Sequence, residues 1–143
     1  MILDGGDRIS LTRSSHFVND SQLIDCQRWT MNYAPNVLMS GVGQSVSRSV
    51  LANSPQQAVF VMGNEHTLED SSIVNASLQC SDCGAYYFGR DLTYRGMKIM
   101  RNQWVLPGKF SQTYGSILTF ILHINGVPCC WTQAPSGLEA ITR

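Results

Sequence analysis

An internal repeat is the sequence feature that most constrains the fold of this chain. Four segments share one pattern, in which two apolar residues stand five positions apart with a serine or asparagine between them. The segments are 18–23, 46–51, 68–73 and 99–104, and the second and third begin 22 residues apart. A period near 22 residues with short strands is typical of a parallel β-helix, a solenoid in which each coil covers its neighbour's apolar face.

A second repeated element precedes three of these segments. It is a short apolar run that ends in glycine, at 37–41, 59–63 and 86–89. Short β-branched and aromatic runs separated by Gly, Asn and Ser indicate strands and turns rather than helices. We therefore predict an all-β solenoid of about four coils over residues 1–107, followed by a divergent tail or cap over residues 108–143, where the pattern stops.

Stacked coils would place equivalent residues above one another at a spacing of about 4.8 Å. The first apolar position of each copy would form one buried ladder, the second would form another, and the small polar residue would lie at a corner and bond to backbone. The three predicted ladders are Val18–Val46–Leu68–Ile99, Leu23–Leu51–Ile73–Trp104 and Ser21–Ser49–Ser71–Asn102. The alternative is that the four matches arose by chance in a β-sandwich.

Charge and cysteine content exclude several classes of function. The 143 residues contain 10 Lys or Arg and 10 Asp or Glu, and a net charge of zero argues against nucleic-acid binding. No apolar run approaches the roughly 20 residues that span a bilayer. Cys80 and Cys83 form one CxxC but no second CxxC accompanies it, so we expect no zinc site, no other metal and no cofactor. Whether Cys80 and Cys83 form a disulfide stays open.

The middle of the chain carries a family resemblance. Gly-Asn-Glu-His-Thr-Leu-Glu at 63–69 and Ser-Asp-Cys-Gly-Ala-Tyr-Tyr-Phe-Gly-Arg-Asp-Leu-Thr-Tyr-Arg-Gly at 81–96 resemble the signature "GNDHxIEYNxIHD … SDAGAIYxGRDWTxRGNxIRYN". That signature belongs to large secreted right-handed parallel β-helix proteins, including glycoside hydrolases with fucosidase- or xylanase-like activity. The resemblance covers about residues 4–105 and implies a right-handed coil and a polysaccharide or glycan partner. No signal peptide opens the chain, so its localisation stays open.

The chain also departs from the family pattern. Leu92 replaces a tryptophan, Cys83 replaces an alanine, and the match stops after Trp104. The family continues there through further coils, one of which carries an acidic strand. We interpret the chain as a fragment or alternative product of a longer β-helix protein, with a true divergent cap as the competing interpretation.

The resemblance and the acidic residues suggest a catalytic pair. We take Asp82 and Asp91 as candidate catalytic carboxylates, because glycosidases use two carboxyl groups at a defined separation. For Asp82, a structural role as a turn residue is an equally weighted alternative. For Asp91, the alternative is an ion pair with Arg90 or Arg95. The partner acid implied by the family would come from the next coil, which this chain lacks. We therefore expect the isolated chain to be inactive.

Substrate-binding candidates surround these carboxylates in the sequence. They are Arg90, Tyr86, Tyr87, His66 and Trp29. Because Tyr86 and Tyr87 alternate across a strand, one should point inward and the other outward as a sugar-stacking platform. His66 is either a general acid or base or a corner histidine bonded to backbone, and Trp29 lines a groove or plugs the end of a coil. Two functions remain open: a domain related to carbohydrate-active enzymes, or a non-catalytic glycan-binding or structural module.

Overall fold

The computed structural model describes residues 1–80, 83–88 and 91–105, and every regular element in them is a β-strand. The strands are β1 (Ile2–Gly5), β2 (Phe17–Asn19), β3 (Gln22–Ile24), β4 (Val37–Val42), β5 (Ser45–Ser47), β6 (Val50–Ala52), β7 (Val59–Asn64), β8 (Thr67–Glu69), β9 (Ser72–Val74), β10 (Tyr86–Tyr87), β11 (Lys98–Met100) and β12 (Gln103–Val105). The described part of the chain is therefore all-β, as predicted.

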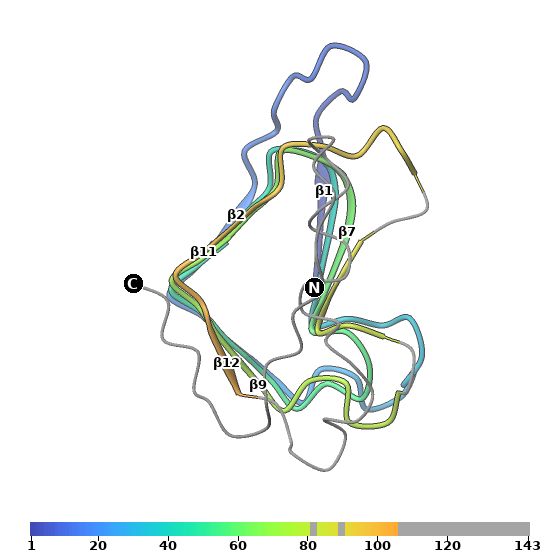
Figure 1. The fold of residues 1–143 in the computed structure, drawn as a ribbon, viewed down its shortest axis with the longest axis vertical. Helices are drawn as coiled ribbons and strands as arrows, with labels where there is room; N and C mark the ends of the chain where they lie inside the picture. The colour runs from blue at the N-terminus through green and yellow to red at the C-terminus, as the bar shows by residue number, and fades with distance from the viewer. Residues whose placement is uncertain (81–82, 89–90, 106–143) are drawn as a thin grey trace, which may run out of the picture.

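The strands form three parallel sheets. The first has the order β1-β4-β7-β10, the second β2-β5-β8-β11 and the third β3-β6-β9-β12. The chain visits the three sheets in the same order each time, and the strands of successive visits overlie one another in Figure 1. We call each visit a pass: β1–β3, β4–β6, β7–β9 and β10–β12. This arrangement is compatible with a β-helix-like solenoid.

The strand register confirms both predicted apolar ladders. Val18 pairs with Val46, Val46 with Leu68 and Leu68 with Ile99 in the second sheet. In the third sheet the paired residues are Leu23, Leu51, Ile73 and Trp104. The ladder residues of the two middle passes have no exposed surface; they are Val46, Leu51, Leu68 and Ile73. Ile99, in the last pass, is only partly buried. Stacking of the passes therefore makes the core, because a single pass cannot bury its own apolar face.

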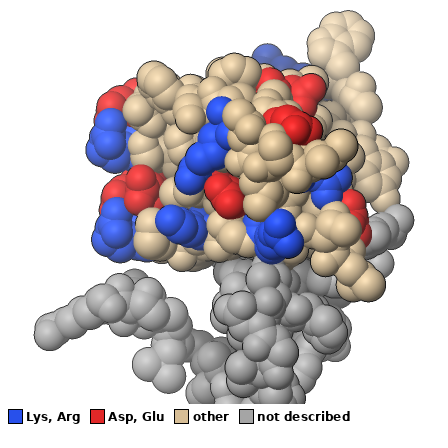
Figure 2. Space-filling model, turned by 90° about the horizontal axis from the view of Figure 1, so that it is seen from above, with Lys and Arg blue, Asp and Glu red and all other residues tan. Residues whose placement is uncertain are grey.

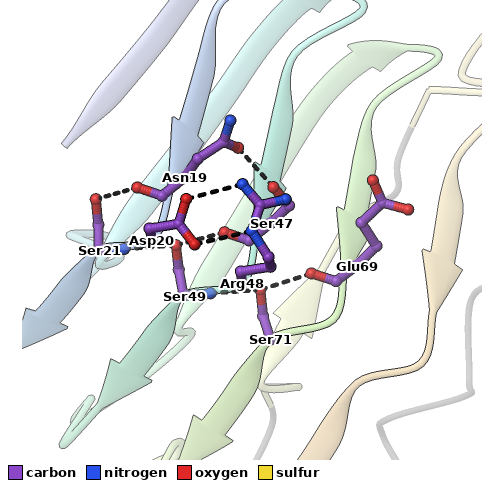
Figure 3. A network of polar contacts seen from close by, with 8 residues as sticks. All are labelled: Asn19, Asp20, Ser21, Ser47, Arg48, Ser49, Glu69 and Ser71. Carbon is purple, nitrogen blue, oxygen red and sulfur yellow. Dashed lines mark hydrogen bonds and ion pairs between the residues drawn. The ribbon is translucent and has the colours of Figure 1, made fainter.

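The small polar residues form the predicted corner between the second and third sheets. Each backbone N–H donates to the side-chain oxygen of the next pass. Ser21 donates to Ser49 Oγ at 3.2 Å and Ser49 to Ser71 Oγ at 3.1 Å (Figure 3), and Ser71 donates to Asn102 Oδ1 at 2.9 Å. The hydroxyls of the three serines donate to a carbonyl two residues earlier. Both backbone and side chain are thereby satisfied, since neither can remain unpaired when buried.

Glycine is required at another corner, where the first sheet ends. Gly5 is opposite Gly41, and Gly41 is opposite Gly63. A Cβ atom at Gly41 would lie 2.0 Å from the Gly5 carbonyl oxygen, and one at Gly63 would lie 2.0 Å from the Gly41 oxygen. Both residues also have positive φ, at 87° and 122°. The glycine-ended runs thus mark the places where successive backbones approach too closely for a side chain.

Two further expectations concern the end of the chain and the membrane. The tail or cap expected over residues 108–143, and the domain boundary after residue 107, lie outside the described residues. Within the described residues, no helix is long and apolar enough to cross a membrane.

Candidate functional site on the first sheet

The outer face of the first sheet carries a continuous apolar row. Ile2, Leu38, Phe60 and Tyr87 are register partners on β1, β4, β7 and β10, and we call them the aromatic row. Their strand neighbours alternate with them and point inward, as the buried Val37, Met39, Val59 and Val61 show. The Phe60 and Tyr87 ring centroids lie 5.4 Å apart, with their planes tilted by 49°. The row thus consists of two aliphatic side chains, from Ile2 and Leu38, followed by the two aromatic rings of Phe60 and Tyr87.

The two tyrosines point in opposite directions, as predicted, and the structure decides between them. Tyr86 points inward and is only 4% exposed, and its ring makes an edge-to-face contact with the Phe88 ring at 6.0 Å between centroids. Its hydroxyl has no hydrogen-bond partner among the described residues, and burial raises the pKa of that hydroxyl far above its usual value. Tyr86 is therefore a core residue, which corrects its place among the substrate contacts. Tyr87 is the outward residue.

A cluster of polar residues lies where the strands of the first sheet end. Arg8 follows β1, and Asp91 follows β10, so the parallel sheet brings their loops to the same corner. Arg8 donates to Asp91 Oδ2 at 3.2 Å, to Thr93 Oγ1 at 2.6 Å and to Asn64 Oδ1 at 3.1 Å. Its guanidinium carbon also lies 4.9 Å from the centroid of the Tyr94 ring. We call these five residues the Arg8 cluster.

The Arg8 cluster stabilises the ionised form of Asp91. Hydrogen bonds from the Thr93 hydroxyl and backbone N–H, followed by the interaction with Arg8, hold the pKa of the Asp91 carboxyl below its usual range. Among the described residues the ion-pair partner of Asp91 is Arg8, 83 positions away in the sequence, and not Arg95; the expected pair with Arg90 lies outside the described residues. An ionised, ion-paired carboxylate is a poor proton donor, because a general acid must be protonated at the working pH.

The other candidate carboxylate cannot be placed beside Asp91. Asp82 and Arg90 both lie outside the described residues. The separation of the two predicted catalytic carboxyls is therefore not defined, and their roles stay predictions.

His66 lies inside the corner between the first and second sheets. It has no exposed surface, its Nδ1 accepts the Gln44 backbone N–H at 3.1 Å, and its Nε2 lies 3.3 Å from the Met62 carbonyl oxygen. This geometry fits the neutral tautomer with the proton on Nε2. Burial lowers the pKa of the ring to about 4. Of the two predicted roles, the structure supports the corner histidine bonded to backbone, and His66 is not accessible to a substrate.

Trp29 lies at the opposite end of the first sheet from Asp91. It belongs to the loop between β3 and β4, which leads into the sheet, whereas Asp91 follows the last strand of the sheet (Figure 1). The Trp29 side chain is 99% exposed, and Tyr33 of the same loop is 62% exposed. The structure therefore separates Trp29 from Asp91 along the strand direction and leaves the aromatic row between them.

Three of the five cysteines lie in the described residues. Cys80 and Cys83 are joined by a disulfide, and Cys26 is a free, exposed thiol. In residues 1–80, 83–88 and 91–105, no three His, Cys, Asp or Glu side chains come together as metal ligands would.

Comparisons with known proteins add no relative to this description. No protein-family model matches the chain, and neither a search of curated proteins nor a search of solved structures finds a match.

Sequence reasoning missed Arg8, Asn64 and Phe60 as members of this face. A signal for Arg8 was present, because Gly5-Gly6-Asp7-Arg8 and Gly89-Arg90-Asp91 both follow a strand of the first sheet. In parallel stacking, residues that follow equivalent strands meet at one corner. Phe60 was treated only as part of an apolar run, although alternation along β7 places it outward between two buried valines.

Proposed function

We propose that this chain is a right-handed parallel β-helix domain of about four coils, related to carbohydrate-active enzymes, that binds glycan on the outer face of its first sheet without cleaving it. The observation that carries the proposal is the aromatic row, with Phe60 and Tyr87 in contact on the outer face. Polar and charged loops border the row at both strand ends, with the Arg8 cluster at one end and Trp29 at the other.

The aromatic row suits a sugar chain for chemical reasons. A pyranose presents C–H groups on its ring faces, which pack on aromatic rings, and hydroxyls at its edge, which need polar partners. Four strands spaced by about 4.8 Å give the row a length of roughly 14 Å. This length suits an extended polymer better than a compact small molecule.

The state of Asp91 supports binding without cleavage. Glycoside hydrolysis needs one protonated carboxyl and a second carboxylate across the bond. Asp91 is ionised and bound by Arg8 and Thr93, so it does not supply the acid. The family's partner acid would come from a further coil, and no Asp or Glu follows Asp91 before Glu139.

The test is a binding and hydrolysis screen of the full chain against plant and algal glycans. Affinity electrophoresis and calorimetry measure binding, and reducing-end release measures cleavage. We expect binding without cleavage, and we expect Tyr87→Ala to weaken the binding. The matched control is Phe17→Ala, because Phe17 is an exposed aromatic residue, 65% accessible, on the second sheet instead.

The outcomes separate the proposal from its competitors. Hydrolysis that disappears in Asp82→Asn would establish an enzyme and refute the non-catalytic assignment. Absence of binding to every glycan would refute the glycan assignment and leave a structural module. Equal loss of binding in Tyr87→Ala and Phe17→Ala would show that the outer face of the first sheet is not the site.

A further inference from the structure

The connection between the third and fourth passes carries a disulfide. It runs from β9 to β10, and within it Cys80 and Cys83 are bonded three positions apart in the sequence. Both cysteines are partly exposed. A disulfide that closes so short a loop adds little to global stability, since its stabilising effect grows with the length of the loop. Exposed disulfides are the ones that thiols open most readily, because a thiolate must reach a sulfur atom.

The chain before Cys80 is fixed to the preceding pass. Three consecutive backbone N–H groups, at residues 77–79, donate to carbonyl oxygens of the loop between β6 and β7. The bonds are Ser77 to Gln56 at 2.8 Å, Leu78 to Ser54 at 3.2 Å and Gln79 to Pro55 at 2.9 Å. Cys80 therefore follows directly on an anchored segment.

The chain after Cys83 leads within two residues into the first sheet. The carbonyl oxygen of the buried Ala85 accepts the N–H groups of both Ala58 and Val59 at 2.9 Å. The strand β10 follows with two residues, whereas β4 and β7 have six each. Few hydrogen bonds between strands hold so short a strand. Its position therefore depends on the segment that precedes it.

The disulfide ties the start of β10 to the anchored segment. The bond keeps the Cα atoms of Cys80 and Cys83 5.9 Å apart. Without it, two residues at this spacing can separate to about 10 Å in an extended chain. The closed disulfide therefore limits how far the start of β10 can move from residues 77–79.

Tyr87 is the member of the aromatic row that this restraint reaches. It lies four positions after Cys83, and its ring centroid lies 5.4 Å from that of Phe60. Phe60 is held more firmly, because β7 pairs with β4 over six residues and β10 pairs with β7 over two. A binding surface loses affinity when one of its groups must be ordered at each binding event.

We propose that the Cys80–Cys83 disulfide is a redox switch: a dithiol reductant opens it, and its opening loosens β10 and weakens glycan binding on the aromatic row. The binding part rests on the function proposed above. One thiolate of the dithiol attacks a sulfur of the disulfide, which breaks the S–S bond, forms a mixed disulfide and releases the other cysteine as a thiolate that takes up a proton. The second thiol loses its proton and attacks the mixed disulfide, which leaves two protein thiols and the oxidised, cyclic reductant. Two electrons pass from the dithiol to the protein.

Hydrogen exchange of backbone amides tests the switch without any glycan. The full chain is equilibrated at rising ratios of reduced to oxidised dithiothreitol. Alkylation and mass spectrometry of the peptide that contains Cys80 and Cys83 report the bond, and circular dichroism reports folding. We expect the bond to open while the chain stays folded.

The N–H groups of Ala58 and Val59 are the reporter amides, because both donate to Ala85 at the start of β10. On reduction they should exchange roughly tenfold faster, since their acceptor is then less firmly held. The Val37 N–H is the internal control. It donates to the Ala58 carbonyl oxygen at 3.0 Å, the equivalent bond one pass earlier, and its exchange should not change.

Three variants separate the switch from other effects. Cys80→Ser/Cys83→Ser lacks the bond and should show fast exchange of the reporter amides with and without reductant, whereas Cys26→Ser should respond like the wild type. Arg48→Ala weakens the contact between passes at another corner, where Arg48 binds Asp20 through two hydrogen bonds of 2.8 Å. Acidic and basic groups alternate at that corner, along the left edge of the view in Figure 2. Arg48→Ala should leave the reporter amides unchanged.

Affinity electrophoresis against the same panel of plant and algal glycans measures the effect on binding. Reduction of the wild-type chain should weaken binding by roughly threefold to tenfold, because Tyr87 must then be ordered at each binding event. The double cysteine variant should bind as weakly as the reduced chain, and reductant should not weaken it further.

Several results would overturn the proposal. They are a disulfide that stays closed until the chain unfolds, reporter amides that exchange equally fast in both redox states, a reduced chain that binds glycan as tightly as the oxidised one, and a double cysteine variant that still responds to reductant. If no glycan binds in either state, the function proposed above is refuted. The hydrogen-exchange response alone then supports or overturns the redox control of β10.

Discussion

Replacing Gly63 by alanine should destabilise the fold more than any ordinary glycine substitution. The new Cβ would lie 2.0 Å from the Gly41 carbonyl oxygen, whereas contacts under 3.0 Å essentially do not occur. That oxygen belongs to the backbone of β4, which β1 and β7 hold on both sides, so it cannot rotate away. The strands must separate instead, and their hydrogen bonds must lengthen.

The expected cost is the sum of two effects. An L-residue at positive φ costs about 1–2 kcal/mol, and overpacking against a fixed backbone costs about 1–3 kcal/mol more. Gly63→Ala should therefore lower the free energy of unfolding by roughly 2–5 kcal/mol, a large part of the roughly 5–15 kcal/mol that a domain has. Gly96→Ala is the matched control, because Gly96 also has positive φ, at 75°, but its Cβ would meet the flexible Glu65 side chain at 3.0 Å.

Urea unfolding followed by far-ultraviolet circular dichroism measures both variants. We expect Gly96→Ala to lose about 1–2 kcal/mol, which is the conformational cost alone. Gly63→Ala should lose about 1–3 kcal/mol more than that, which is the overpacking cost. If the two variants have midpoints that differ by less than the equivalent of about 1 kcal/mol, the close approach of successive glycine backbones is wrong.

Three further predictions follow from the buried groups and the Arg8 cluster. Since the pKa of His66 is lowered to about 4 from 6.5, the unfolded chain protonates first on acidification, so stability should fall by up to about 3 kcal/mol between pH 6.5 and 4; His66→Gln should flatten that slope in urea titrations. Leu68→Ala should cost about 3–5 kcal/mol in urea unfolding and Ile99→Ala clearly less, because Leu68 has no exposed surface and Ile99 ends its ladder; equal losses would contradict the ladder. Arg8→Ala should raise the pKa of Asp91 in an NMR titration but leave it below the usual range, since the Thr93 bonds remain; an unchanged pKa would show that Arg8 does not act on it.

The sequence predicted the fold's periodic parts because their spacing is a local property. The apolar positions of each repeat and the serine or asparagine between them recur in every pass, and both ladders pair in the predicted register. Neither the loop lengths nor the insertions disturbed that pattern. The corner hydrogen bonds also followed from residue type, because a serine hydroxyl at a turn bonds readily to nearby backbone.

The candidate site was predictable only in part, because its contacts are set by stacking across long sequence distances. Asp91 was expected to pair with Arg90 or Arg95, and among the described residues, which exclude Arg90, its partner is Arg8, which the stacking brings from the first pass. The orientation of Tyr86 and Tyr87 depends on a single-residue register, which alternation alone does not fix. His66 combined a catalytic residue type with a corner position, and only burial distinguishes the two roles.

The most direct test of the stacked parallel arrangement is a set of nuclear Overhauser contacts between β5 and β8 in the isotope-labelled chain. The account places residues 45–47 in parallel register with residues 67–69, and the Thr67 N–H donates to the Gln44 carbonyl oxygen at 2.9 Å. It predicts contacts from amide protons of one strand to α-protons of the other, repeated between β2 and β5. Strong contacts between facing α-protons, as antiparallel strands give, would contradict it.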